Sequence, residues 1–177
     1  RQAAPFTNWL RSVTFGSPGG AGQFVTVGEG GLIALSADGT NWQRRTSPTT
    51  ADLNRVVWDG AQFLAVGNGG KILSSGSGLV WQAENSGATN TLNAAAGRVG
   101  SRLVERDTEL RLSENRSSWS NELDAAKPFR APPWTYLTAL WDGTSYLVGG
   151  RTGMLVEGFK TNASASSTVW LESTESP

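Results

Sequence analysis

The residue types that most often perform chemistry in proteins are scarce in this chain. Its 177 residues include no histidine and no cysteine, which removes the usual general base, the commonest metal ligand, disulfide bonds and thiolate metal sites. Acidic residues remain, and most glycoside hydrolases use a pair of them. No spacing in the sequence pairs any two of the candidates, Glu29, Asp107, Glu109 and Glu122. We therefore interpret them as solvated groups and predict no catalytic residue.

Two further features suggest ligand chemistry but are better explained by turns. Glycines cluster in residues 28–31 and again in 67–70, as in a phosphate-binding loop, yet no Lys-Ser/Thr pair closes the motif and no helix follows it. Tight turns need glycine for their own geometry. Asp38 and Asp59 are conceivable calcium ligands, but a single carboxylate per turn falls short of an oxygen cage. We predict no cofactor and no metal site.

The composition limits the class of partner. Lys plus Arg number 15 and Asp plus Glu number 15, a balance that argues against a nucleic-acid or anionic-membrane partner. The apolar runs are too short to span a membrane, so no membrane insertion is expected. Few lysines, many small polar residues and glycines, and the absence of cysteine are typical of exported bacterial proteins. We therefore expect a bacterial protein that is extracellular or periplasmic.

The elements that must position any site form an internal repeat. Residues 24–42 and 63–81 align without a gap, 39 residues apart, with Phe24 on Phe63 and Trp42 on Trp81. The third copy is more divergent. It aligns 38 residues after the second, again without a gap, through Val104, Leu110, Ser113 and Trp119. The fourth copy restarts at 141–143, where Trp-Asp-Gly repeats residues 58–60, and it ends late at Trp170 after a polar insertion.

Each copy is predicted to form four short strands joined by tight turns. In the second copy these are 53–58, 61–66, 71–75 and 80–84, with an Asp59-Gly60 hairpin turn whose two positions favour positive φ. Residues 101–126 have helical propensity, but 109–113 alternate with period two, which favours a strand. Antiparallel four-stranded sheets recurring about every 40 residues are typical of propeller blades. The sequence predicts one all-β domain, 1–177: a β-propeller of four antiparallel four-stranded blades, with repeats at roughly 9–48, 49–90, 91–130 and 131–175.

A turn motif gives these repeats a family resemblance. Residues 36–42, Ser-Ala-Asp-Gly-Thr-Asn-Trp, resemble the Asp-box, or bacterial neuraminidase repeat, of propellers in exported bacterial proteins. The second copy keeps Ser75 and Trp81 but has glycine in place of aspartate. The resemblance implies a structural turn between the third and fourth strands, in which Asp38 bonds turn amides and Trp42 packs beneath them. The family includes sialidases, xyloglucan-cleaving enzymes, sorting-receptor ectodomains and photosystem assembly factors, so the fold does not select a function.

The family's sialidases need an arginine cluster, an acid, and a tyrosine nucleophile with a glutamate partner. Of the two tyrosines here, Tyr146 occupies a core phenylalanine position and spacing gives Tyr136 no partner. Four tryptophans precede strands or turns and could stack on sugar rings: Trp9, Trp58, Trp134 and Trp141. We predict a non-catalytic propeller module for binding or assembly, whose partner is a protein or a glycan. The alternative is a fragment that contributes blades to a sialidase-like or xyloglucanase-like glycoside hydrolase.

One face of the predicted propeller carries the candidate binding residues. The turns between the second and third strands share that face with the inter-blade loops. Their side chains vary from copy to copy while the scaffold around them is constant, and loop positions of this kind usually carry function. The candidates are Glu29, Asn68, Arg106, Asp107, Arg151 and Trp134.

Four units are enough for a small closed ring. An open end would leave apolar faces uncovered, which repeat proteins cap or bury. We therefore expect the chain to close on itself as a monomer. The alternative is a dimer that completes a larger ring.

The strand assignment predicts the circular dichroism spectrum of the chain. Every periodic segment has strand-plus-turn chemistry, so the far-ultraviolet spectrum should show β-sheet and almost no helix. Helix above about a fifth of the residues, traced to 101–126, would contradict the third repeat.

Overall fold

The structure is a computed structural model that describes residues 6–106, 109–113, 118–121, 136–150, 155–159 and 169–172. These residues form strands and three short 3-10 turns, and no α-helix occurs among them. None of them belongs to a helix that is long and apolar enough to cross a membrane. The all-β prediction is confirmed, including strands at 101–106 and 109–113 within the segment of helical propensity.

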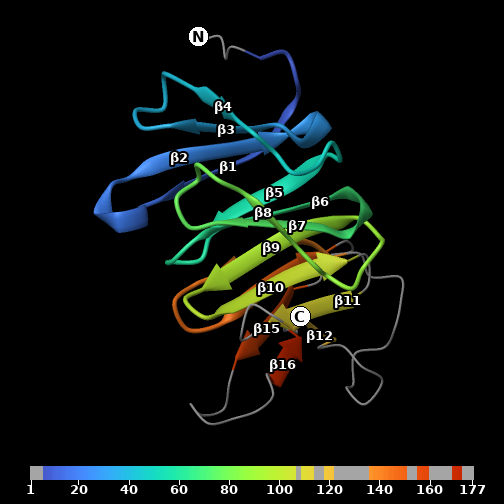
Figure 1. Cartoon of the computed structure of the whole chain (residues 1–177). Helices are drawn as coiled ribbons and strands as arrows, with labels where there is room; N and C mark the ends of the chain where they lie inside the picture. The colour runs from blue at the N-terminus through green and yellow to red at the C-terminus, as the bar shows by residue number, and fades with distance from the viewer. Residues whose placement is uncertain are drawn as a thin grey trace.

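The strands make four antiparallel sheets in which neighbours in the chain are neighbours in the sheet (Figure 1). Sheet 1 contains β1 (Leu10–Gly16), β2 (Gln23–Gly28), β3 (Ile33–Ser36) and β4 (Gln43–Arg45). Sheet 2 contains β5 (Leu53–Trp58), β6 (Phe63–Gly67), β7 (Lys71–Ser75) and β8 (Gln82–Glu84). Sheet 3 contains β9 (Leu92–Arg98), β10 (Ser101–Arg106), β11 (Glu109–Ser113) and β12 (Ser120–Asn121). Sheet 4 contains β13 (Tyr136–Trp141), β14 (Tyr146–Gly150), β15 (Leu155–Phe159) and β16 (Val169–Glu172).

The sheets stack face to face in chain order (Figure 1). The first strands of successive sheets, β1, β5, β9 and β13, lie side by side. Successive residues of a strand point to opposite faces, so each internal sheet buries one face against its predecessor and the other against its successor. We call these the leading and trailing faces. In sheet 2, Val56 and Phe63 pack with sheet 1, whereas Leu64 and Ile72 pack with sheet 3. The core therefore lies between the sheets.

The register corrects the alignment of the third repeat. In sheet 2, Gly67 pairs with Lys71 across the 3-10 turn η3 (Asn68–Gly70), whereas in sheet 3 Arg106 pairs directly with Glu109. The third hairpin is thus one residue shorter, and a gapless alignment through it is wrong. The strands before the turn are related to sheet 2 by 39 residues and those after it by 38. Arg102 consequently occupies the position of Phe63.

Arg102 replaces an aromatic contact with a buried ion cluster. It is fully buried, and its Nε donates to Asp59 Oδ2 at 2.9 Å while its Nη1 donates to Glu84 Oε1 at 2.8 Å. Both carboxylates belong to sheet 2. Gly97, paired with Arg102, stands where Trp58 stands beside Phe63, and a Cβ there would lie 2.7 Å from Asp59 Cβ. Because Gly97 has no side chain, the Arg102 guanidinium has space to reach the two carboxylates of sheet 2.

The hairpin turn at Asp59 is longer than the two residues predicted from Asp-Gly. Trp58 pairs with Phe63, so the turn spans 59–62, closed by the Asp59 N–H on the carbonyl of Gln62. The Asp59 carboxylate also accepts hydrogen bonds from the backbone N–H groups of Ala61 and Gln62, both at 2.8 Å. An aspartate that ties the turn together in this way removes the need for positive φ at both central positions.

The turn at Asp38 has the predicted staple geometry. Asp38 Oδ1 accepts the N–H groups of Thr40 and Asn41 at 2.7 Å, and the Trp42 indole donates to the Gly39 carbonyl at 3.1 Å. Sheet 2 builds the same turn without an aspartate: the Gly78 N–H donates to Ser75 Oγ and the Trp81 indole donates to the Gly78 carbonyl. Serine and tryptophan therefore suffice for the turn, and the aspartate adds bonds to it.

The four sheets do not close on one another in the described part of the chain, contrary to the expectation of a self-contained ring. Sheets 1 and 4 lie at opposite ends of the stack (Figure 1). On their outward faces Val13 is 60% exposed, Phe15 52% and Leu140 58%. The apolar ends that closure should bury remain open to solvent.

The buried ion cluster predicts an unequal response to arginine removal. Arg102→Ala removes the cationic partner that Asp59 and Glu84 share at a sheet junction, so the free energy of unfolding should fall by about 3–5 kcal/mol. The control Arg44→Ala, at an exposed position on β4, should change it by less than about 0.5 kcal/mol. Urea denaturation followed by tryptophan fluorescence measures both. Equal stabilities of the two variants would show that the cluster is not important to the junction.

The aspartate turns predict two low carboxyl pKa values. Hydrogen bonds from the N–H groups of Asn41 and Thr40 hold the pKa of Asp38 far below its usual 3.8, and those from Ser145 and Thr144 lower the pKa of Asp142 to about 2. Because the folded pKa lies below the unfolded one, this stabilisation is complete above about pH 4 and is lost as the pH falls through the lowered values. A ¹³C NMR titration should show both carboxylates still ionised at pH 3.8. Asn41→Ala keeps the backbone N–H but removes the side-chain amide that donates to Asp38 Oδ2 at 2.6 Å, so it should raise the pKa of Asp38 part of the way and leave Asp142 unchanged. Titration of wild-type Asp38 at 3.8 or above would contradict the geometry.

Candidate functional site

Two equivalent turns define a common edge of sheets 1 and 2, which we call the turn face. They are η2 (Glu29–Gly31) and η3, and Glu29 and Asn68 take the same position in each. The Glu29 N–H donates to the Trp9 carbonyl at 3.0 Å, and the Asn68 N–H donates to the Asp52 carbonyl at 2.9 Å. Each turn is thus fixed to the residue that leads into the first strand of its own sheet.

The glycines around these positions are required by close backbone approach. A Cβ on Gly28 or Gly67 would lie 2.0 Å from the carbonyl oxygen of Trp9 or Asp52. Gly31 and Gly70 have positive φ, and each is approached just as closely by the carbonyl of an inter-sheet loop, at Thr49 and Ala88. The backbone conformation thus explains the glycine motif, as predicted. The side chain between the glycines is the part free to vary.

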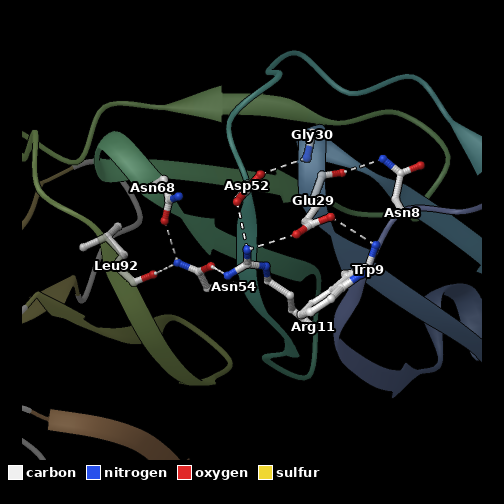
Figure 2. A network of polar contacts seen from close by, with 9 residues as sticks. All are labelled: Asn8, Trp9, Arg11, Glu29, Gly30, Asp52, Asn54, Asn68 and Leu92. Atoms are coloured by element: carbon white, nitrogen blue, oxygen red, sulfur yellow. Dashed lines mark hydrogen bonds and ion pairs between the residues drawn. The ribbon is translucent and has the colours of Figure 1, made fainter.

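A polar network joins the two turns (Figure 2). Arg11 in β1 is its centre: Nη2 donates to Asp52 Oδ2 at 2.9 Å and lies 3.7 Å from Glu29 Oε1, and Nη1 donates to Asn54 Oδ1 at 3.2 Å. The other carboxylate oxygen of Asp52 accepts the Gly30 N–H at 2.9 Å. One guanidinium therefore holds side chains from both sheets together.

The network continues toward sheet 3. Asn54 Nδ2 donates to Asn68 Oδ1 at 3.1 Å and to the Leu92 carbonyl at 3.0 Å (Figure 2). At the other end, Asn8 Nδ2 donates to the Glu29 carbonyl at 3.2 Å and the Trp9 N–H lies 3.4 Å from Glu29 Oε2. The contacts thus extend from the segment before β1 across sheet 2 to the start of β9.

The network is open to solvent, which limits its contribution to stability and leaves it accessible. The side chains of Arg11, Glu29 and Asp52 are each about a third exposed. Ion pairs this exposed stabilise a fold by about 0–1 kcal/mol. Trp9, beside Glu29, is 75% exposed. Exposed aromatic and arginine side chains on a preformed polar scaffold are the composition of a recognition surface rather than of a core.

Two of the predicted site residues are brought together here. Glu29 and Asn68 belong to the one network, joined through Arg11 and Asn54. Arg106 is the last residue of β10 and pairs with Glu109, so it matches Gly67 rather than a turn residue, contrary to its predicted place. The other three candidates lie outside the described residues: Asp107, Trp134 and Arg151.

Sequence reasoning missed the three residues that connect the turns, Arg11, Asp52 and Asn54. The available signal was topological: the first strand of each sheet begins beside the turn between its second and third strands, so residues at those starts share the turn face. In residues 6–106 and the shorter described segments, no group of three acidic side chains is placed to hold a metal ion.

Comparison with models of known protein families finds no match, and comparison with curated proteins also finds none. Among solved structures, the chain is similar to YCF48 from Cyanidioschyzon merolae, with a TM-score of 0.66 and 16% identity over 96% of this chain and 57% of that one. It is also similar to YCF48 bound to D1 peptide, with a TM-score of 0.58 and 14% identity over 93% of this chain and 54% of that one. A third similar structure is the computationally designed Ika4 protein, with a TM-score of 0.64 and 8% identity over 87% of this chain and 92% of that one.

These likenesses concern the fold. YCF48 is a β-propeller protein, so the stacked antiparallel sheets have a propeller-type arrangement. The chain spans a little over half the length of the YCF48 chains that it matches. It spans nearly all of the designed protein.

Proposed function

We propose that the chain is a non-catalytic β-propeller module that binds a protein partner through the turn face. The observation that carries the proposal is the network around Arg11, which presents Glu29, Asn68 and the exposed Trp9 on one preformed surface. The rigid strands and glycine turns hold these side chains in place before a partner arrives. Such preorganisation lowers the entropy lost on binding.

The chemistry of the turn face favours a polar, basic segment of the partner. Two carboxylates, Glu29 and Asp52, surround the single guanidinium of Arg11, which leaves an excess negative charge among these residues. Asn54 and Asn68 add amide groups of the kind that pair with a peptide backbone. The known structure of YCF48 with a bound D1 peptide supports protein binding by a propeller of this architecture. We place this function in an extracellular or periplasmic bacterial setting, on composition alone.

Trp9 favours a glycan as the second candidate. An indole that is 75% exposed next to hydrogen-bonding side chains is able to stack on a sugar ring. The hydrolase-fragment alternative would rest on Glu29 and Asp52 around Arg11. Hydrolysis of chromogenic glycosides by the wild-type chain, and not by Glu29→Gln, would support that alternative.

A peptide selection tests the proposed function. A random peptide library displayed on phage is selected on the immobilised chain, and the affinity of a selected peptide is measured by calorimetry. We expect basic peptides to be enriched. The triple variant Trp9→Ala, Glu29→Ala and Asn68→Ala should weaken the binding by more than about 2 kcal/mol, roughly thirtyfold, because it removes the exposed indole, an amide and a carboxylate that would face the basic peptide.

The control variant is Thr144→Ala, at the exposed hairpin turn of sheet 4, which should bind like the wild type. Circular dichroism confirms that each variant keeps its β-sheet. Binding that survives the triple substitution and is lost with Trp58→Ala or Trp141→Ala would move the site to the hairpin turns. Enrichment of no peptide, with retention of the chain on a glycan array that needs Trp9, would favour the glycan.

A further inference from the structure

The two open ends of the sheet stack are the matching halves of a junction that occurs three times inside the molecule. Each internal sheet presents a leading face to its predecessor and a trailing face to its successor. Among the described residues, no sheet precedes the leading face of sheet 1 and none follows the trailing face of sheet 4 (Figure 1). The side chains on both faces keep the character of a buried junction.

On the leading face of sheet 1, the exposed residues stand where other sheets bury theirs. Val13 is 60% exposed, whereas its counterparts Val56, Ala95 and Ala139 are at most 2% exposed. Leu10 is 48% exposed, whereas Leu53 and Leu92 are fully buried. Apolar side chains exposed at positions that the other sheets bury mark an interface.

On the trailing face of sheet 4 the pattern recurs. Leu155 is 43% exposed, whereas its counterparts Ile33, Ile72 and Leu110 are at most 1% exposed. Leu140 is 58% exposed, whereas its counterpart Ala96 is 2% exposed and shares a buried cluster with Ala139 of the following sheet. Since Ala139 corresponds to Val13, that internal junction shows how Leu140 and Val13 would meet.

A hollow on the leading face of sheet 1 corresponds to a site that, in sheet 2, is filled by a side chain of the preceding sheet. It encloses about 590 Å³, and its lining includes Val13, Gly39 and Trp42. The counterpart of Gly39 in sheet 2 is Gly78, where a Cβ would come within 2.7 Å of Leu35 Cδ1 from sheet 1. Leu35 of sheet 1 therefore fills the site beside Gly78 in sheet 2, whereas the corresponding site beside Gly39 in sheet 1 is open.

The residue that corresponds to Leu35 in sheet 4 is Glu157, which is exposed. The hollow that would receive it is also lined by Arg55, whose Nε is buried without a hydrogen-bond partner. A carboxylate thus stands on one free face, and a guanidinium nitrogen without a hydrogen-bond partner lines the hollow on the other. This charge complementarity singles out sheet 4 of the same sequence as the occupant of the face.

We propose that a second copy of this chain covers both faces, with sheet 4 of each copy packed on sheet 1 of the other. The contact is head to tail, and two such contacts close a ring of two chains. Contact between sheets 1 and 4 of one chain is excluded by their positions at opposite ends of the stack (Figure 1). The proposal goes beyond the proposed function, because this interface lies between end sheets and requires no partner protein.

Sedimentation equilibrium of the full chain at micromolar concentration tests the proposal. We expect twice the 18.7 kDa of one chain. Val13→Glu damages only the leading face and Leu140→Glu only the trailing face, and each should reduce the mass to that of a monomer. Both side chains are exposed in the single chain, so β-sheet circular dichroism should persist. The control Val80→Glu, at a 70% exposed position on a turn of sheet 2, should leave the dimer intact.

Mixing the two monomeric variants tests the head-to-tail arrangement. One undamaged trailing face and one undamaged leading face remain in the mixture, so dimers held by a single junction should reappear, with weaker association than the wild type. A wild-type monomer would overturn the proposal and assign the faces to further blades of a longer chain. A dimer insensitive to Leu140→Glu would overturn it in favour of paired sheets 1, and open-ended filaments would show that two chains do not close the ring.

Discussion

The packing of one sheet on the next governs the rest of this structure. An internal sheet is covered on both faces, so its strands cannot alternate between apolar and polar residues as a half-exposed sheet does. All of β6 is buried, from Phe63 to Gly67. Tight turns are then the place for polar groups, and the aspartate and serine turns bond their own backbone so that few N–H groups are left unpaired beside the core. Stability in such a stack is approximately a sum over sheets and nearest-neighbour junctions.

The junctions are chemically unequal. Between sheets 1 and 2 the contact is aromatic and aliphatic, with Phe63 and Trp81 inside the cluster. Between sheets 2 and 3, Arg102 replaces the aromatic ring and bonds two carboxylates of the preceding sheet. A buried ion pair resists the loss of one partner strongly but adds little over a well-packed apolar contact. The third sheet therefore depends on a match between specific side chains of two repeats, which a uniform repeat does not require.

The sequence was sufficient for the all-β class and for the first two repeats, because a 39-residue offset relates every strand of sheets 1 and 2 from Phe24 onward. It misled at the third repeat, where the offset changes from 39 to 38 at a turn that has lost one residue. Side-chain direction alternates along a strand, so this single residue exchanges the faces assigned to β10. Only the observed pairing restores Val104 to the face shared with Ala95.

For the candidate site, repeat logic found Glu29 and Asn68 because they vary at one position of a constant turn. Arg11, Asp52 and Asn54 differ in type and repeat membership, and they act together only because the strand starts converge at the turn face. Closure of the four sheets into a ring was the other feature that the sequence could not predict. Apolar patterning gives each sheet two buried faces but does not give the angle between sheets, which decides whether four of them complete a ring.

The glycine turns also bear on how such a surface could be redesigned. Gly28, Gly31, Gly67 and Gly70 each face a backbone carbonyl that leaves no room for a side chain, so their identity is fixed by the fold. The residue after Gly28 or Gly67 donates its backbone N–H to the residue that leads into the first strand of its sheet, and this bond does not depend on its side chain. Randomising positions 29 and 68 would therefore diversify chemistry at two matched points without altering the scaffold. Each added repeat of this kind would supply one more such position, so the turn face behaves as a modular array for engineered recognition.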